Sequence, residues 1–174
     1  MKSFRARLII VMLIQMFILA LFPLSTLWME RGGQAVVLDG EVYGTSRSWA
    51  GTYYSFGLDI RDISWDLVEK PAPANVDGWP RDSIIVYVVL AKAEEKYDVS
   101  RVTWSKPTLA DDEVMLIGRT YDLRSPVLWV NYDLNRFYVS ENERMDWHYP
   151  TKNAQIELLV TPNGYARVKE IVIK

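Results

Sequence analysis

An uncharged run near the start of the chain, Leu8–Leu27, limits what the sequence can fold into. It reads LIIVMLIQMFILALFPLSTL, 20 residues without a charged side chain. An α-helix of this length is about 30 Å long, which matches the hydrocarbon core of a bilayer. The sequence therefore predicts a single-pass transmembrane helix followed by a tethered domain.

The charges on either side of this run predict its orientation. Lys2, Arg5 and Arg7 precede it, whereas Glu30 and Arg31 follow it and cancel. By the positive-inside rule, the N-terminus is cytoplasmic and the C-terminal domain is periplasmic or otherwise extracytoplasmic. We therefore expect the protein in the inner (cell) membrane.

A cleaved signal peptide is the competing interpretation of the same run. Its apolar region would be about 7–15 residues long and would end in a small-x-small cleavage site. The run here is longer, and residues 24–28 form only a poor site. The length favours an anchor that is retained.

Two side chains of the anchor are candidate partner contacts. Gln15 is the only strongly polar side chain in the run, and an amide there either hydrogen-bonds a neighbouring helix or is simply tolerated. Trp28 directly follows the run, where an amphipathic ring suits the membrane–water interface.

The remaining chain is long enough for one ordinary domain. We divide the sequence into a cytoplasmic stub and anchor at residues 1–29, a hinge at 30–34 and an extracytoplasmic domain at 35–174. Runs rich in β-branched and aromatic residues predict strands in this domain at residues 35–38, 52–60, 83–93, 97–104, 114–121, 127–132, 137–139, 154–161 and 165–173. Almost no helix separates them. The predicted fold is mostly β, an antiparallel β-sandwich or open barrel.

Three stretches give sharper structural predictions. The apolar run Ser83–Ala93 predicts a central strand buried on both faces. Asn163 and Gly164 between two alternating runs predict a β-hairpin turn. The segment Glu41–Gly51 is small and polar apart from its aromatic residues, and we expect it to be a loop.

Composition argues against several kinds of chemistry. The chain has no cysteine and one histidine, so thiolate sites and histidine-based catalytic or metal sites are not expected. Its net charge is -2, without the basic excess typical of nucleic-acid binding. We expect no enzyme activity, no cofactor, no metal and no nucleic-acid partner.

Two kinds of chemistry have candidate residues in the sequence, and each set also has a structural explanation. A Ser/Lys hydrolase would use Ser46 or Ser48 with Lys92, although loop serines more commonly cap turns. A hard cation would bind the carboxylates of residues 111–113, or those of 59, 62 and 66, although neither set has calcium-loop spacing.

Aromatic residues supply more candidates, since the chain has seven tryptophans and ten tyrosines. Aromatic side chains dominate the energetics of protein interfaces. One candidate contact patch is Trp147, His148 and Tyr149, which alternatively fold onto their own domain. Another is the predicted loop with Tyr43 and Trp49.

The chain resembles the GDYXXLXY family of uncharacterised bacterial membrane-anchored proteins. The resemblance rests on the motif segment Gly51–Leu58, on a Val-Tyr-Val-Val-Leu strand at Val86–Leu90, on Leu116–Arg119 and on Arg136–Glu141. These segments follow the family's order along the whole chain.

The family motif itself is only partly kept. Gly51 and Tyr53 match it, whereas Thr52, Phe56 and Leu58 replace its Asp, Leu and final Tyr. The resemblance implies a topology and work beside other membrane proteins, but no reaction. Gly51 and Tyr53 therefore join the candidate partner contacts.

The sequence as a whole favours a non-catalytic accessory subunit of a larger membrane complex, for example a respiratory or photosynthetic assembly. Its expected partners are integral membrane protein subunits and the lipid bilayer. The alternatives are a membrane-tethered periplasmic module that binds or senses a ligand, and a tethered hydrolase.

Overall fold

The structure, a computed structural model, describes residues 9–21, 32–70, 83–140 and 151–174. The chain separates into two compact units, Met1–Gly33 and Gln34–Lys174. Each unit is described by itself below.

The first unit contains an α-helix over residues 9–21. Its apolar side chains are exposed along its length, as at Leu13 and Phe17, and Gln15 is exposed as well. Within the described residues, no helix has both the length and the apolar character needed to cross a membrane. Residues 8 and 22–27 of the predicted anchor, and Trp28 after it, lie outside the described residues.

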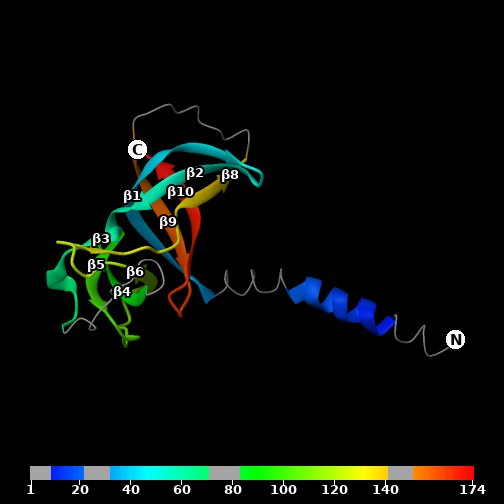
Figure 1. Cartoon of the computed structure of the whole chain (residues 1–174), viewed down its shortest axis with the longest axis horizontal. Coiled ribbons are helices and arrows are strands. Elements are labelled where there is room, and N and C mark those ends of the chain that lie inside the picture. Colours follow the sequence, from blue (N-terminus) through cyan, green and yellow to red (C-terminus); the bar gives the residue numbers. More distant parts are fainter. Residues whose placement is uncertain (1–8, 22–31, 71–82, 141–150) are drawn as a thin grey trace. The chain divides into compact units, whose positions relative to one another are not determined.

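The second unit is built from antiparallel β-strands in three sheets. The largest sheet has the strand order β10-β9-β1-β2-β8. Its strands are β1 (Gln34–Ser48), β2 (Gly51–Leu58), β8 (Arg136–Val139), β9 (Lys152–Val160) and β10 (Ala166–Ile173). Figure 1 shows this sheet curling into a half-barrel, with the green strands of the next sheet gathered on one side of it.

The other two sheets are smaller. A three-stranded sheet has the order β5-β4-β6, and a short pair joins β3 to β7. Their strands are β3 (Asp62–Ile63), β4 (Ile84–Ala93), β5 (Lys96–Thr103), β6 (Glu113–Thr120) and β7 (Leu128–Trp129). Two 3₁₀ turns, η1 (Asp59–Arg61) and η2 (Trp65–Leu67), flank β3. The mostly β, antiparallel fold predicted from the sequence is confirmed.

The long strand β1 organises the curled sheet. Its first part pairs with β9 from Gln34 to Val42, and its second part pairs with β2 from Gly40 to Ser48. A β-bulge between Val42 and Gly44 bends the strand between these two pairings. The curl of the sheet follows from this change of partner along one strand.

The prediction of a loop at Glu41–Gly51 is therefore wrong. The small polar residues continue β1, and only Trp49 and Ala50 form the turn to β2. Gly51 restarts the strand with φ +126°, a conformation that glycine adopts without strain. Pairing with β2 is a tertiary interaction, and it overrides the weak strand propensity of these residues.

The other two sharp predictions are confirmed. In β4, the consecutive side chains of Val88, Val89 and Leu90 are all buried, so the middle of the strand is covered on both faces. The β9–β10 hairpin turns through Thr161–Tyr165, where the Gly164 N–H donates to the Thr161 carbonyl. Both features depend on local sequence patterns.

One hydrophobic core joins the two larger sheets. Its buried residues come from both of them, for example Leu38 of β1, Leu90 of β4 and Ile156 of β9. A shared core makes Gln34–Lys174 a single domain. Side chains also join β1 to β5, where the described residues show no strand pairing: the Gln34 Nε2 donates to Tyr97 Oη at 2.9 Å, and the Lys96 Nζ donates to Asp39 Oδ2 at 2.6 Å.

Candidate functional site

The family motif lies on β2, and the strand sorts its side chains onto two faces. Thr52, Tyr54, Phe56 and Leu58 point inward and are buried. The alternation of a β-strand places Tyr53 on the opposite, outer face. The motif's preserved tyrosine is therefore a surface residue, and its replaced positions lie in the core.

Tyr53 is framed by two side chains of β8. Tyr138 is its cross-strand partner, and the two ring centroids lie 5.6 Å apart. The guanidinium of Arg136 lies 5.1 Å from the Tyr53 ring centroid, which is within cation–π range. This cluster holds the tyrosine in place on the surface of the sheet.

Tyr43 lies farther along the same face. Its Oη accepts a hydrogen bond of 2.6 Å from Arg61 Nη1. The ring reaches over Gly57, where a Cβ would lie only 2.3 Å from Tyr43 Oη. A side chain at position 57 would therefore displace the Tyr43 hydroxyl from its contact with Arg61.

Trp49 lies at the tip of the β1–β2 hairpin and is fully exposed, at 101%. We define the aromatic face as Tyr43, Trp49, Tyr53 and Tyr138 together with Arg61 and Arg136. Most of this face lies in residues 42–58 and 136–140. These two ranges contain arginine and no acidic residue. Arg61, however, pairs with Asp62, and the carboxylates of Glu41, Asp59 and Asp62 line a pocket beside Tyr43. The aromatic face therefore carries charges of both signs.

The structure brings together four of the predicted contact residues. Tyr43, Trp49 and Tyr53 lie on the aromatic face, and Gly51 is the first residue of β2, directly after the turn that carries Trp49. Gln15 belongs to the other unit. Trp147, His148 and Tyr149 lie outside the described residues, as does Trp28.

Sequence reasoning missed Tyr138, Arg136 and Arg61. A signal was available for the first two, because the sequence predicts a short strand at residues 137–139 and the family resemblance includes Arg136–Glu141. What could not be foreseen is that this strand would pair with β2 and not with its neighbours in sequence.

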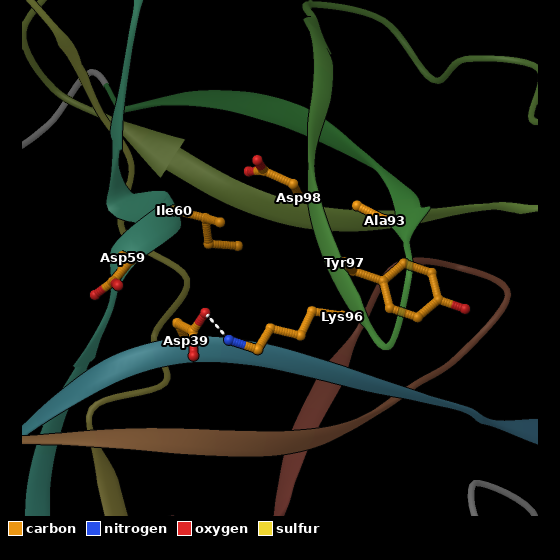
Figure 2. Close-up of a pocket in the computed structure, with 7 residues that line it drawn as sticks. All are labelled: Asp39, Asp59, Ile60, Ala93, Lys96, Tyr97 and Asp98. Carbon is orange, nitrogen blue, oxygen red and sulfur yellow. Dashed lines mark hydrogen bonds and ion pairs between the residues drawn. The ribbon is translucent and has the colours of Figure 1, made fainter. Parts of the chain in front are cut away.

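A second candidate is a groove between the first half of β1 and the β4–β5 hairpin. It has a volume of about 360 Å³. Its lining residues are Asp39, Asp59, Ile60, Ala93, Lys96, Tyr97 and Asp98. Figure 2 shows Asp39 and Lys96 pointing toward one another across it. Sequence reasoning did not anticipate this groove.

The carboxylates of the groove differ in their electrostatic surroundings. The hydrogen bond from Lys96 lowers the pKa of Asp39, and Lys174 adds to this effect from 3.4 Å. Burial raises the pKa of Asp59, and repulsion from Asp39 and Glu41 raises it further. Three carboxylates and one ammonium line the groove, so it attracts cationic groups more than anionic ones.

The serines of the proposed hydrolase have structural roles or lie far from the lysine. Ser48 Oγ donates to the Gly51 carbonyl at 3.3 Å and accepts from Ala50 N at 3.2 Å, so it caps the hairpin turn. Lys92 pairs with Tyr97, which contacts Gln34 at the start of β1. Ser46 lies at the other end of that strand, roughly 40 Å away along an extended chain. The structure does not bring this dyad together.

Three of the six predicted cation ligands, Glu113, Asp62 and Asp66, have other partners. The guanidinium of Arg101 binds both carboxylate oxygens of Glu113. Asp62 pairs with Arg61 at 3.3 Å, and Asp66 accepts from Ser64 Oγ at 3.4 Å. Across the described ranges, no group of three or more His, Asp or Glu side chains is arranged to hold a metal ion.

Comparison with known proteins gives one match. Residues 15–171 match the sequence profile of the GDYXXLXY protein family, so the match covers both units. No curated protein and no solved structure matches the chain.

Proposed function

Because the chain belongs to the GDYXXLXY family, we propose that it is a membrane-tethered, non-catalytic accessory subunit that docks onto a larger complex of integral membrane proteins. The N-terminal segment holds it in the inner membrane, and the β-domain lies on the periplasmic side. A respiratory or photosynthetic assembly is an example of such a complex.

The N-terminal helix supports the membrane tether. Consecutive helical residues point in directions about 100° apart, and the successive residues Ile10, Val11 and Met12 are 56%, 52% and 55% exposed. Apolar side chains exposed all around a helix need an apolar environment, and lipid supplies one. The same uncharged run continues in sequence to Leu27, which gives the length that a bilayer requires.

The aromatic face is the observation that carries the docking proposal. Tyr43 and Tyr138 are 39% and 49% exposed, and Tyr53 lies between a second tyrosine and an arginine. Tyrosine, tryptophan and arginine are the residues most enriched at interface hot spots. The preserved tyrosine of the motif belongs to this face, which links the face to family membership.

The direct test is purification of the full chain from its host membranes in mild detergent. We expect an integral membrane protein to co-purify in fixed stoichiometry with the wild type. The double variant Tyr53→Ala/Tyr138→Ala should lose it, because the exposed aromatic pair is removed. Tyr165→Ala is a matched control, since Tyr165 is 64% exposed but lies on the β9–β10 turn.

A lone monomer from the wild-type preparation would contradict the docking proposal. Equal recovery of the partner with the double variant would show that the aromatic face is not the contact. A melting temperature that matches the wild type separates loss of contact from loss of folding.

A ligand-binding module is the second candidate function, and the groove favours it. Polar groups converge there on a volume of about 360 Å³, within the range of small-molecule sites. The probe is spermidine, because carboxylates outnumber ammonium groups in the groove. A rise in melting temperature with spermidine that Asp98→Asn reduces would support this candidate, and no rise at millimolar concentration would count against it.

A further inference from the structure

The turn of the β9–β10 hairpin carries a reactive dipeptide. Asn163 is exposed, and the next residue is Gly164, which has no side chain to shield its backbone nitrogen. In an asparagine–glycine sequence that nitrogen can attack the carbonyl carbon of the asparagine side chain, which is one reason why asparagine is thermolabile. We therefore expect Asn163 to lose its amide nitrogen when the chain is unfolded.

The folded turn holds the attacking nitrogen in a different contact. The Gly164 N–H donates a hydrogen bond of 2.8 Å to the Thr161 carbonyl, and the Gly164 carbonyl accepts one of 2.9 Å from the Ile117 N–H of β6. The φ of Gly164 is +84°, a conformation that glycine adopts without strain. Both peptide groups of this residue are thus occupied, so the turn must open before the nitrogen can attack.

The tip of the hairpin also packs against β6. Gly164 is buried, and a Cβ built on it would lie 2.9 Å from Ile117 Cγ1 and 3.0 Å from Met115 Cε. β6 is an edge strand of the three-stranded sheet, so the tip lies against the border of that sheet. A hairpin tip in such a place opens locally at a lower free energy than the whole domain unfolds.

We propose that Asn163 is a site of spontaneous deamidation, and that the contact of Gly164 with β6 controls its rate. The amide is retained while the tip lies against β6, and it is lost irreversibly when the tip moves away. This modification site depends neither on the membrane tether nor on a docked partner.

The reaction balances with water as its only co-reactant. The Gly164 nitrogen forms a bond to Asn163 Cγ, the bond from Cγ to Nδ2 breaks, and the amide leaves as ammonia with the proton of the Gly164 nitrogen. Water then opens the resulting succinimide at either of its carbonyl carbons, so that residue 163 becomes aspartate or isoaspartate. No atom is oxidised or reduced.

The two products differ in their effect on the turn. Asn163 Oδ1 accepts a hydrogen bond of 3.5 Å from Lys106 Nζ, so an aspartate carboxylate in that place lies beside an opposite charge. An isoaspartate instead adds one methylene to the backbone before Gly164, which moves the glycine from its position against β6. Isoaspartate formation therefore keeps the tip away from β6.

The test compares deamidation of the full chain in detergent, folded or unfolded in urea, at mildly alkaline pH. Mass spectrometry of proteolytic peptides measures the conversion of each asparagine, and isoaspartate is quantified with protein isoaspartate methyltransferase. Asn135 and Asn153 are internal controls, because the residues that follow them, Arg136 and Ala154, have side chains that hinder the attack.

We expect Asn163 to convert in urea while the two control asparagines do not, and to convert more slowly in the folded chain by about ten-fold or more. Thr161→Val removes the hydroxyl that bonds Tyr165 across the turn, and should accelerate conversion several-fold in the folded chain but not in urea. Gly40→Ala is the matched control, because Gly40 pairs with Ala154 near the other end of β9. It should leave the folded-state rate unchanged.

An Asn163 that does not convert in urea would overturn the site itself. Equal rates in the folded chain and in urea would overturn the control by β6. Equal acceleration by Thr161→Val and Gly40→Ala would show that the site is reached by global unfolding, which contradicts control by the tip.

Discussion

Gly40 lies where β1 is paired on both sides, with Leu58 of β2 and Ala154 of β9. A Cβ at this position would lie 2.4 Å from the Gly57 carbonyl oxygen and 2.6 Å from Ile156 Cδ1. The first of these atoms belongs to the backbone and cannot rotate away. At the scale of single residues, the curled sheet therefore depends on a position that tolerates no side chain.

Gly40→Ala should destabilise the domain by about 1–3 kcal/mol, because the methyl group forces β1 and β2 apart. The control is Gly32→Ala, since no atom lies within 4 Å of a Cβ built there. The control should change stability by less than about 0.5 kcal/mol. Urea unfolding followed by circular dichroism measures both, and equal stabilities for the two variants would contradict the close contact.

Thr120 is fully buried, and its Oγ1 has no hydrogen-bond partner among the described residues. Thr120→Val keeps the shape and removes the unpaired hydroxyl, so it should stabilise the domain by about 1–2 kcal/mol. Thr161→Val is the matched comparison, because the Thr161 hydroxyl bonds both the N–H and the carbonyl of Tyr165. The Thr161→Val variant should be less stable than the wild type by about 1 kcal/mol, because both of these hydrogen bonds are lost. Thermal unfolding of the two variants should shift in opposite directions, and a loss of stability in Thr120→Val would mean that the hydroxyl has a partner.

At the scale of elements, the contact between β1 and β5 depends on side chains and so responds to pH. The folded state lowers the pKa of Asp39, chiefly through the hydrogen bond from Lys96. The stability that this carboxylate adds is present above its usual pKa of 3.8 and is lost as the pH falls through its lowered folded-state value. Asp59 behaves in the opposite way, because burial and neighbouring carboxylates raise its pKa.

Asp39→Asn should therefore be less stable than the wild type at pH 7 and no less stable at pH 2. Asp59→Asn should be more stable than the wild type at pH 7, and the difference should disappear below the usual aspartate pKa. Denaturant unfolding at a series of pH values measures both differences. A destabilisation of Asp39→Asn that persists at pH 2 would show that the carboxylate charge is not its cause.

The elements that could be predicted from sequence are those whose cause is local. β4 follows from an unbroken apolar run, and the β9–β10 hairpin follows from Asn163-Gly164 between alternating strands. The second half of β1 was missed because its strand state depends on pairing with β2. The predicted strand at 127–132 is shorter than expected, since β7 covers only Leu128–Trp129 and Asn131 bridges separately to Arg119.

The candidate site, like the fold, has one part that local sequence predicts and another part that depends on tertiary contacts. Tyr43, Trp49 and Tyr53 were predicted because aromatic residues and a family motif are visible in the sequence. The Asp39–Lys96 pair was not predicted, because it joins residues 57 positions apart through the approach of two sheets. Sequence patterns identify which residues are suited to contacts, whereas the fold decides which of them meet.

At the scale of the whole molecule, a β-domain with its own core is joined to an N-terminal segment whose apolar side chains lie exposed. The aromatic face adds an exposed aromatic surface to that domain. The proposed tether in the bilayer would account for the segment, and the proposed docked neighbour would account for the face. Each of these roles requires the β-domain to be held outside the cytoplasm by a segment that stays in the membrane.

Single-cysteine labelling of the full chain in spheroplasts measures this requirement directly. Ser3→Cys and Asn163→Cys each place one thiol in a chain that has no other. A membrane-impermeant maleimide should label position 163 in intact spheroplasts and position 3 only after lysis, with both variants in the carbonate-washed membrane fraction. Labelling of both positions before lysis, protection of position 163, or release of the chain by carbonate would contradict the account.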